Sequence, residues 1–202
     1  MPDEALFWKY DWLAVVEAQK AAARKDAENM SKADFAQRSF EELRVGLCEK
    51  YSLEVPALDL DNITVSQRET EIDVSHDRMR YFSTGDPHLV KGTAIDVRVP
   101  FVGDPGTCNI KPTTWTTSLP RGRIEGNSVR FTISGTNLLP EKVKSAIDHR
   151  ISEIQEWLGF QEKSVGNFPN ELAQVAMQAL EARKKKLDAD TELISGLGYW
   201  TE

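Results

Sequence analysis

The chain has 202 residues, 40 % of them apolar, which is enough for one folded domain with a substantial core. Acidic residues outnumber basic ones by 32 to 25, giving a formal net charge of −7, so a general nucleic-acid coat protein is not expected. Cys48 and Cys108 are too few for a disulfide scaffold. Together with an N-terminus that lacks a basic and then apolar leader, they predict a cytoplasmic protein with no membrane partner.

Residues 1–55 predict an N-terminal helix pair. Residues 4–27 are dense in helix-forming residues, with Trp8 and Trp12 on one helical face. Ser31 followed by Asp34 predicts a new N-cap with a capping-box acid. Beyond this cap, apolar residues recur every three or four positions and predict an amphipathic helix: Ala36, Phe40, Leu43, Leu47 and Tyr51.

Residues 56–138 change to a period of two and predict strands. Asp61-Asn62 indicates a turn between short strands, and alternation predicts further strands at 70–74 and 95–101. Pro100 places the end of the latter strand at an edge or a bulge. The β-branched stretch 113–117 predicts another strand, and Gly126-Asn127 indicates a hairpin. We therefore expect an antiparallel sandwich or curled sheet.

Residues 139–202 return to a helical period. Pro140 suits a first helical turn, and we expect that helix to end at Gly159. A second helix is predicted from about Pro169, so the segment is expected to form a long antiparallel helical hairpin. The predicted fold is α+β: a central antiparallel β-rich domain flanked by N-terminal helices and this hairpin.

The familiar motifs of nucleotide, hydrolase and zinc chemistry are missing from the sequence, so we assign no catalytic residue, metal or cofactor. One polar group, Asp73 with His76, Asp77, Asp86 and His88, has the residue types of a divalent-metal site. A metal-dependent nucleotide or phosphodiester hydrolase is therefore one alternative. Asp and His in such turn-rich sequence are equally typical of turns.

A second group lies between Asp104 and Arg130, where the sequence contains four basic residues and two acidic ones. It predicts a site for a small anionic ligand at Lys111, Trp115, Arg121 and Arg123. The alternative is that the arginines only decorate a hairpin and Trp115 lies in the core. The run 183–186 is basic, but acids follow it, which favours a solvated helix end over a nucleic-acid site.

The stretch Val99-Pro100-Phe101-Val102-Gly103-Asp104, together with Pro120-Arg121-Gly122 and the closing Leu197-Gly198-Tyr199, resembles an uncharacterised bacterial family. Its members carry a VPFxGD strand and a C-terminal helical hairpin, and some continue into a C-terminal effector domain. The resemblance implies a sensing or regulatory module in bacterial stress or antiviral defence. It implies no catalytic residue.

These observations predict a non-enzymatic sensing or protein-interaction module that regulates a separate effector. The expected partner is another protein chain, either a second copy or the effector. Aromatic and narrow apolar helical stripes are typical of partner-binding faces. They suggest an interface made by Trp8, Trp12, Ile151, Ile154 and Trp157.

Overall fold

A computed structural model describes residues 3–75 and 88–197 of the chain. The chain forms two compact units, the first made of Met1–Tyr10 with Glu54–Glu162 and the second of Asp11–Leu53 with Lys163–Glu202. The α+β class is confirmed, as is the antiparallel sheet. The three predicted segments follow the chain, whereas each compact unit combines pieces that are far apart in sequence.

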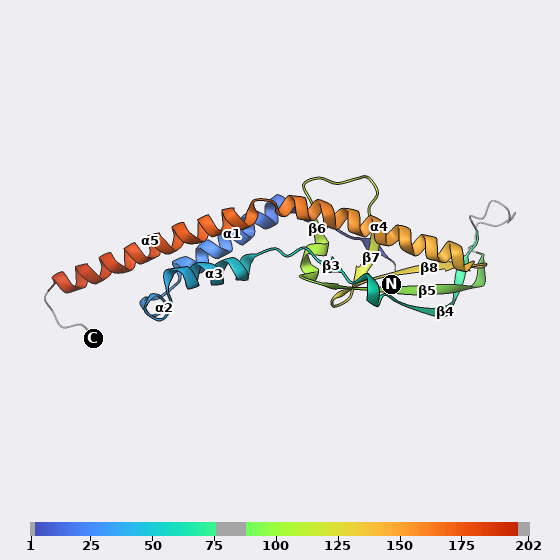
Figure 1. Cartoon of the computed structure of the whole chain (residues 1–202), viewed down its shortest axis with the longest axis horizontal. Coiled ribbons are helices and arrows are strands. Elements are labelled where there is room, and N and C mark those ends of the chain that lie inside the picture. The colour runs from blue at the N-terminus through green and yellow to red at the C-terminus, as the bar shows by residue number, and fades with distance from the viewer. Residues whose placement is uncertain (1–2, 76–87, 198–202) are drawn as a thin grey trace. The chain divides into compact units, whose positions relative to one another are not determined.

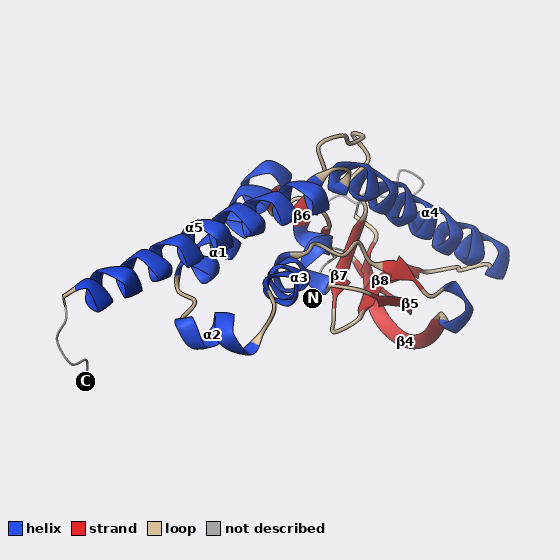
Figure 2. Cartoon of the chain, turned by 60° about the vertical axis from the view of Figure 1, so that its left-hand side comes forward, coloured by secondary structure: helices blue, strands red, loops and turns tan. Residues whose placement is uncertain are grey.

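The first unit is built on a curled antiparallel sheet (Figures 1 and 2). Its path runs β1 (Glu4–Ala5), β7 (Arg121–Ile124), β8 (Ser128–Gly135), β5 (Leu89–Val102) and β3 (Ala57–Leu58). The long strand β4 (Thr64–Asp73) pairs with β5 along its whole length. Two residues each of β2 (Tyr10–Asp11) and β6 (Ile110–Lys111) form a separate ladder, and 3-10 turns span Leu60–Asn62 and Pro105–Asn109.

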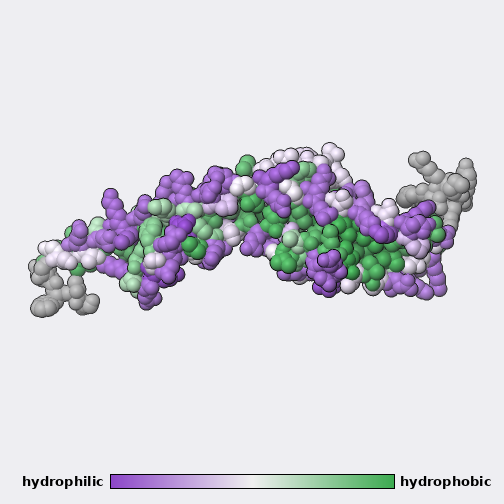
Figure 3. All heavy atoms as spheres, in the orientation of Figure 1, coloured by the Kyte–Doolittle hydropathy of each residue, from purple (hydrophilic) through white to green (hydrophobic). Residues whose placement is uncertain are grey.

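Strand alternation gives this sheet one apolar and one polar face. Val97 and Val99 of β5 and Val129 and Phe131 of β8 are at most 1 % exposed. They pack with Ile151, Ile154, Trp157 and Leu158 of helix α4 (Pro140–Val165) in one core cluster. Figure 3 shows apolar residues gathered between α4 and the sheet, with hydrophilic residues over the outer surface of the helix. The helix therefore covers one face of the sheet only.

The predicted hairpin at Gly126-Asn127 is confirmed between β7 and β8, and Gly126 takes a positive φ of 56° that favours glycine. Pro100 lies where the partner of β5 changes. Pairing with β4 ends at Arg98 and pairing with β3 begins at Phe101, so the missing N–H of proline falls between two ladders. The pairing of β5 is therefore interrupted at Pro100, although the expected strand end is not there, because β5 continues to Val102.

One strand prediction is wrong. The stretch 113–117 is a loop, and Trp115 at its centre is 44 % exposed, because β-branched propensity alone does not supply a pairing partner. The predicted turn at Asp61-Asn62 is confirmed as a 3-10 turn between β3 and β4, although β4 is longer than expected, at ten residues.

The second unit is helical and contains α1 (Trp12–Glu28), α2 (Lys32–Gln37), α3 (Phe40–Tyr51) and α5 (Phe168–Gly196). Ala27 of α1, Leu43 and Leu47 of α3, and Ala176 and Leu180 of α5 form its buried cluster. The predicted capping box of Ser31 and Asp34 is confirmed. A second capping box, Ser39 with Glu42, divides the single predicted helix over 34–51 into α2 and α3.

The N-terminal helix begins later than predicted. Asp11 accepts hydrogen bonds from the backbone N–H groups of Leu13 and Ala14 and is the N-cap of α1. Residues 4–11 before it form two short strands, and Phe7 has a positive φ of 56°, which no helix accommodates. Trp8 and Trp12 therefore do not share a helical face.

The C-terminal segment holds two helices, α4 (Pro140–Val165) and α5 (Phe168–Gly196), as predicted. Gly159 lies inside α4 and does not end it. The break comes at Gly166, whose φ is 36°. The stripe of α4 is covered by the sheet in the first unit, and that of α5 by α1 and α3 in the second.

Candidate functional site

The residues predicted as a partner interface are mostly covered by the chain itself. Ile151, Ile154 and Trp157 lie in the core under the sheet, each at most 7 % exposed, and Trp157 donates its indole N–H to the Ser118 carbonyl at 2.8 Å. Trp12 is 3 % exposed. These four side chains are buried within the chain and are therefore not available as partner contacts. Trp8 alone is on the surface, 43 % exposed.

The predicted anion site divides into two places. Lys111 and Trp115 come together with Trp8: the Lys111 ammonium lies 4.1 Å from the Trp8 ring centroid and 4.2 Å from that of Trp115. The two indole rings meet edge to face, 5.5 Å apart. The lysine thus makes cation–π contacts within the chain, which stabilises the exposed loop carrying Trp115. Trp115 is exposed, so the alternative interpretation that places it in the core is wrong.

Arg121 and Arg123 lie on β7, and only Arg123 joins a larger site. Arg121 is exposed, and its carbonyl accepts a hydrogen bond from Arg150 at 2.7 Å. Arg123 stands directly opposite Arg130 of β8, and Arg130 stands directly opposite Arg98 of β5. Residues opposite each other in a sheet project from the same face. Three arginines therefore form a continuous row across three neighbouring strands, which we call the arginine row.

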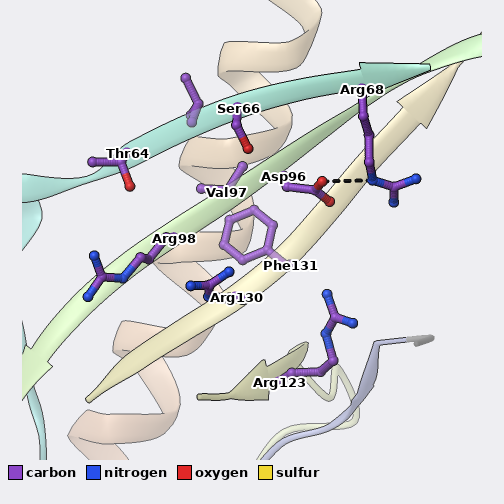
Figure 4. A pocket seen from close by; sticks show the side chains of 10 residues that line it. Thr64, Ser66, Arg68, Asp96, Val97, Arg98, Arg123, Arg130 and Phe131 are labelled. Atoms are coloured by element: carbon purple, nitrogen blue, oxygen red, sulfur yellow. Dashed lines mark hydrogen bonds and ion pairs between the residues drawn. The ribbon is translucent and has the colours of Figure 1, made fainter. Parts of the chain in front are cut away.

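Neighbouring strands lie about 4.8 Å apart, so the arginine row extends over about 10 Å. Like charges directly opposite each other destabilise a sheet. Arg68 of β4 adds a fourth guanidinium on the same face (Figure 4). We call the surface of Arg68, Arg98, Arg123 and Arg130 the arginine face. It is the polar side of the sheet, opposite α4, and it gathers positive charge in a chain whose net charge is −7.

Two arginines of the row, Arg98 and Arg130, have weak partners within the chain. Arg98 donates from Nε to the neutral Ser128 hydroxyl at 2.9 Å. Arg130 makes an ion pair with Glu125 at 3.0 Å, but both side chains are nearly half exposed, at 46 % and 48 %. Exposed pairs of this kind contribute about 0–1 kcal/mol. An incoming anion could replace the carboxylate of Glu125 at little cost.

Asp96 is the carboxylate nearest the centre of the arginine face, and both of its oxygens are engaged. One accepts from the Thr132 hydroxyl at 2.7 Å and the other from Arg68 Nε at 2.8 Å. These hydrogen bonds, Thr132 first, lower the pKa of Asp96, and the charge of Arg123 lowers it further. Asp96 therefore stays ionised and holds Arg68 in place.

A hollow of about 670 Å³ lies over the arginine face. Hydroxyls of Thr64 and Ser66 on β4 line one side of it, and the four arginines supply most of the hydrogen-bond donors (Figure 4). This volume is within the range of small-molecule sites. Arginine presents a planar fork of N–H groups that matches carboxylate and phosphate oxygens in pairs. The geometry suits an anion with several oxygens.

Arg68, Arg98 and Arg130 were not among the predicted site residues, although Arg130 belonged to the basic group that suggested the site. Each was available as a polar position in an alternating strand, but only the register places Arg98 beside Arg130 and Arg123. The sequence did carry one signal. Val97 and Phe131, the chain neighbours of Arg98 and Arg130, are apolar and buried, so the two arginines must project from the opposite face of the sheet.

The candidate metal group lies mainly outside the described residues, since His76, Asp77 and Asp86 fall in 76–87. Asp73 accepts from the Ser75 N–H at 2.9 Å, and the His88 N–H donates to the Ser75 hydroxyl at 2.8 Å. Within 3–75 and 88–197, no cluster of three His, Cys, Asp or Glu side chains could hold a metal ion. The described part of the chain therefore offers no three-residue metal site for the hydrolase alternative.

None of the helices in the described part of the chain is long and apolar enough to cross a membrane. Comparison of the chain with protein-family models, curated proteins and solved structures found no match.

Proposed function

We propose that this protein is a non-enzymatic sensing module that binds a small phosphate-bearing ligand on the arginine face. The single observation that carries the proposal is the arginine row, in which Arg98, Arg130 and Arg123 stand directly opposite one another on three strands. Like charges directly opposite one another oppose the stability of a sheet, and an anionic ligand that contacts the row would relieve this repulsion.

A phosphate-bearing ligand fits the donor chemistry better than a single carboxylate. Among the described residues that line the hollow, the cations are four arginines and no lysine. Arginine is favoured over lysine where paired hydrogen bonds to a planar or tetrahedral oxyanion are needed. A row of about 10 Å can contact two or three linked phosphoryl groups at once.

A small ligand fits better than a nucleic acid. The hollow of about 670 Å³ accommodates a molecule of nucleotide size. Single-stranded nucleic acids are usually held by stacking on exposed aromatic rings, whereas the one aromatic residue lining the hollow, Phe131, is only 1 % exposed. The acidic remainder of the chain would also repel an extended polyanion.

The sensing part of the proposal is that ligand occupancy, without turnover, is the signal. Regulation of a separate effector chain in bacterial stress or antiviral defence rests on the sequence resemblance and on no structural observation. Binding and the absence of turnover can be tested directly with the purified chain.

The test is calorimetric titration of the full chain with inorganic triphosphate, pyrophosphate and orthophosphate. We expect triphosphate to bind most tightly. A double substitution, Arg98→Gln with Arg130→Gln, should weaken its binding at least about 10-fold, because two charged donors are lost. The matched control is Arg24→Gln, which removes an exposed arginine from α1 in the other unit and should leave binding unchanged.

Equal affinity of the double variant and the native chain would overturn the proposal, and so would failure of all three anions to bind. Thermal unfolding of each variant shows whether the fold is retained. Release of orthophosphate from triphosphate by the native chain would contradict the non-enzymatic part and favour the hydrolase alternative.

A further inference from the structure

A second polar row lies beside the arginine row on the same face of the sheet. Ser66 of β4 stands directly opposite Asp96 of β5, and Asp96 stands directly opposite Thr132 of β8. We call these three residues the Asp96 row. Asp96 precedes Arg98 by two residues, and side chains two positions apart on a strand share a face and lie about 7 Å from each other.

The Asp96 carboxylate has acceptor capacity that its partners in the chain do not use. An ionised carboxylate offers about four lone-pair sites. The Thr132 hydroxyl takes one of them and Arg68 Nε takes another. The Asp96 side chain is 34 % exposed and lines the hollow (Figure 4). A bound ligand can therefore donate a hydrogen bond to Asp96 while its present partners stay in place.

The charges around Asp96 decide which kind of group can donate to it. An ionised phosphoryl oxygen has no proton to donate and is repelled by the carboxylate. An ammonium group is repelled by the four guanidinium groups of the arginine face. A neutral hydroxyl is repelled by neither, and a carboxylate is a common acceptor for sugar hydroxyls. The exposed Ser66 hydroxyl, which also lines the hollow, can donate to or accept from such a group.

The described residues that line the hollow offer no flat apolar surface for a nucleobase. The apolar ones are Val65, Val97 and Phe131. Val97 and Phe131 are each 1 % exposed, and Val65 stands opposite Val97, so it projects from the other face of the sheet. Bases are commonly held by stacking on aromatic or apolar side chains. The part of the ligand beyond its phosphates is therefore expected to be polar.

We infer that the ligand of the arginine face is a phosphorylated sugar or similar polyol, whose hydroxyls bind Asp96 and Ser66 while its phosphates lie on the arginine row. The inference rests on the proposed function and names the chemical class of the ligand. The step of about 7 Å between the two rows is close to the length of a sugar ring with its hydroxyls. Asp96 thus determines specificity, because it favours phosphate esters with hydroxyls over esters of equal charge without them.

The test is calorimetric titration of the full chain with two esters that carry the same triphosphate group, methyl triphosphate and ribose triphosphate esterified at the primary hydroxyl. We expect the ribose ester to bind at least about 10-fold more tightly, because hydrogen bonds to a charged acceptor are the strong ones. Asp96→Asn should reduce this preference to about 3-fold or less, since the acceptor is then neutral. Its affinity for methyl triphosphate should stay the same or rise, because a negative charge beside the phosphates is removed. Damage to the fold would instead weaken the binding of both esters.

A second variant tests the hydroxyl of the Asp96 row. Ser66→Ala should reduce the preference for the ribose ester by about 3-fold, because one neutral hydrogen bond is lost. The matched control is Ser134→Ala, which removes an exposed hydroxyl of β8 that does not line the hollow and should leave both affinities unchanged. Adenosine triphosphate should bind no more tightly than the ribose ester, because this face has no surface for the base.

Equal affinity for the two esters, with both weakened by Arg98→Gln and Arg130→Gln, would overturn this inference and leave the proposed function standing. A preference for the ribose ester that persists in Asp96→Asn would overturn the inference as well. So would adenosine triphosphate that binds at least about 10-fold more tightly than the ribose ester, since the base would then be recognised. Failure of both esters to bind would overturn the inference and the proposed function together.

Discussion

The two faces of the sheet in the first unit are built from the same strands but have different physical roles. In β8, Val129 and Phe131 point to α4 and are buried, while Arg130 between them points the other way and is exposed. In β5, Val97 and Val99 flank Arg98 in the same manner. The covered face supplies stability through apolar burial. The arginine face opposes stability through like charges and is available for binding.

This contrast predicts the largest loss of stability on the covered face. Replacing Phe131 by Ala should lower the free energy of unfolding by about 3–5 kcal/mol, because the ring is 1 % exposed and its removal leaves a cavity. Urea denaturation measures the change. A loss below about 1 kcal/mol would mean that α4 does not pack on this face as described.

A smaller loss is expected from a buried polar contact of α4. Gln161 is 0 % exposed, and its side-chain amide donates to the carbonyls of Thr107 at 2.6 Å and Ile110 at 2.8 Å. Gln161→Leu keeps the apolar volume but leaves these carbonyls without that donor, so we expect a loss of about 2 kcal/mol. Urea denaturation measures the change, and Gln161→Glu, which keeps the side-chain shape but replaces the donor by a carboxylate, should lose at least as much stability. Native stability in both variants would contradict this role.

The core cluster under α4, which includes Cys108, also predicts that the protein loses stability in alkali. Burial raises the pKa of the Cys108 thiol to about 12, and the charge of Asp104 adds to this, from an ordinary value of about 9. Above pH 9 the unfolded chain releases this proton while the folded chain keeps it. The free energy of unfolding should therefore fall by about 1.4 kcal/mol per pH unit between these values.

Denaturant unfolding at several alkaline pH values, for the native chain and Cys108→Ala, measures that contribution. Below pH 9 the thiol is protonated in both states, so it adds no pH dependence there. The slope assigned to Cys108 should be missing in the variant. Identical slopes in the two chains would show that the thiol is not shielded from water.

The smallest stability effect is expected on the arginine face. Replacing Arg130 by Gln relieves repulsion with Arg98 and Arg123 and loses only a half-exposed ion pair with Glu125. The melting temperature without ligand should therefore stay the same or rise slightly. The gain in melting temperature caused by triphosphate should shrink. A large loss of stability would show that the row serves the fold and not a ligand.

Much of the fold could be predicted because local signals agree with it. The alternation around Val97 and Phe131, the Gly126-Asn127 turn and the capping box at Ser31 each depend on neighbouring residues only. The errors arose where contacts with residues far away in the sequence decide the local secondary structure. The stretch 113–117 has strand composition but no pairing strand, and Gly159 lies in a helix that the sheet stabilises beyond it.

The candidate site was predicted only in part for the same reason. Composition between Asp104 and Arg130 indicated excess positive charge and included Arg123. The register that joins Arg123 to Arg98 brings together residues from strands 25 positions apart in sequence. The choice among Lys111, Arg121 and Arg123 likewise required the structure, because cation–π contacts with Trp8 and Trp115 engage Lys111 elsewhere.

The most direct test of the arginine face is a nitrogen NMR spectrum of the arginine side chains, recorded while inorganic triphosphate is added to the full chain. Single Arg→Gln variants assign the signals of Arg98, Arg123 and Arg130. We predict that these three signals shift together and saturate at one concentration, while that of Arg24 on α1 stays in place. Unchanged signals from the arginine row, or equal shifts at Arg24, would contradict binding at this face.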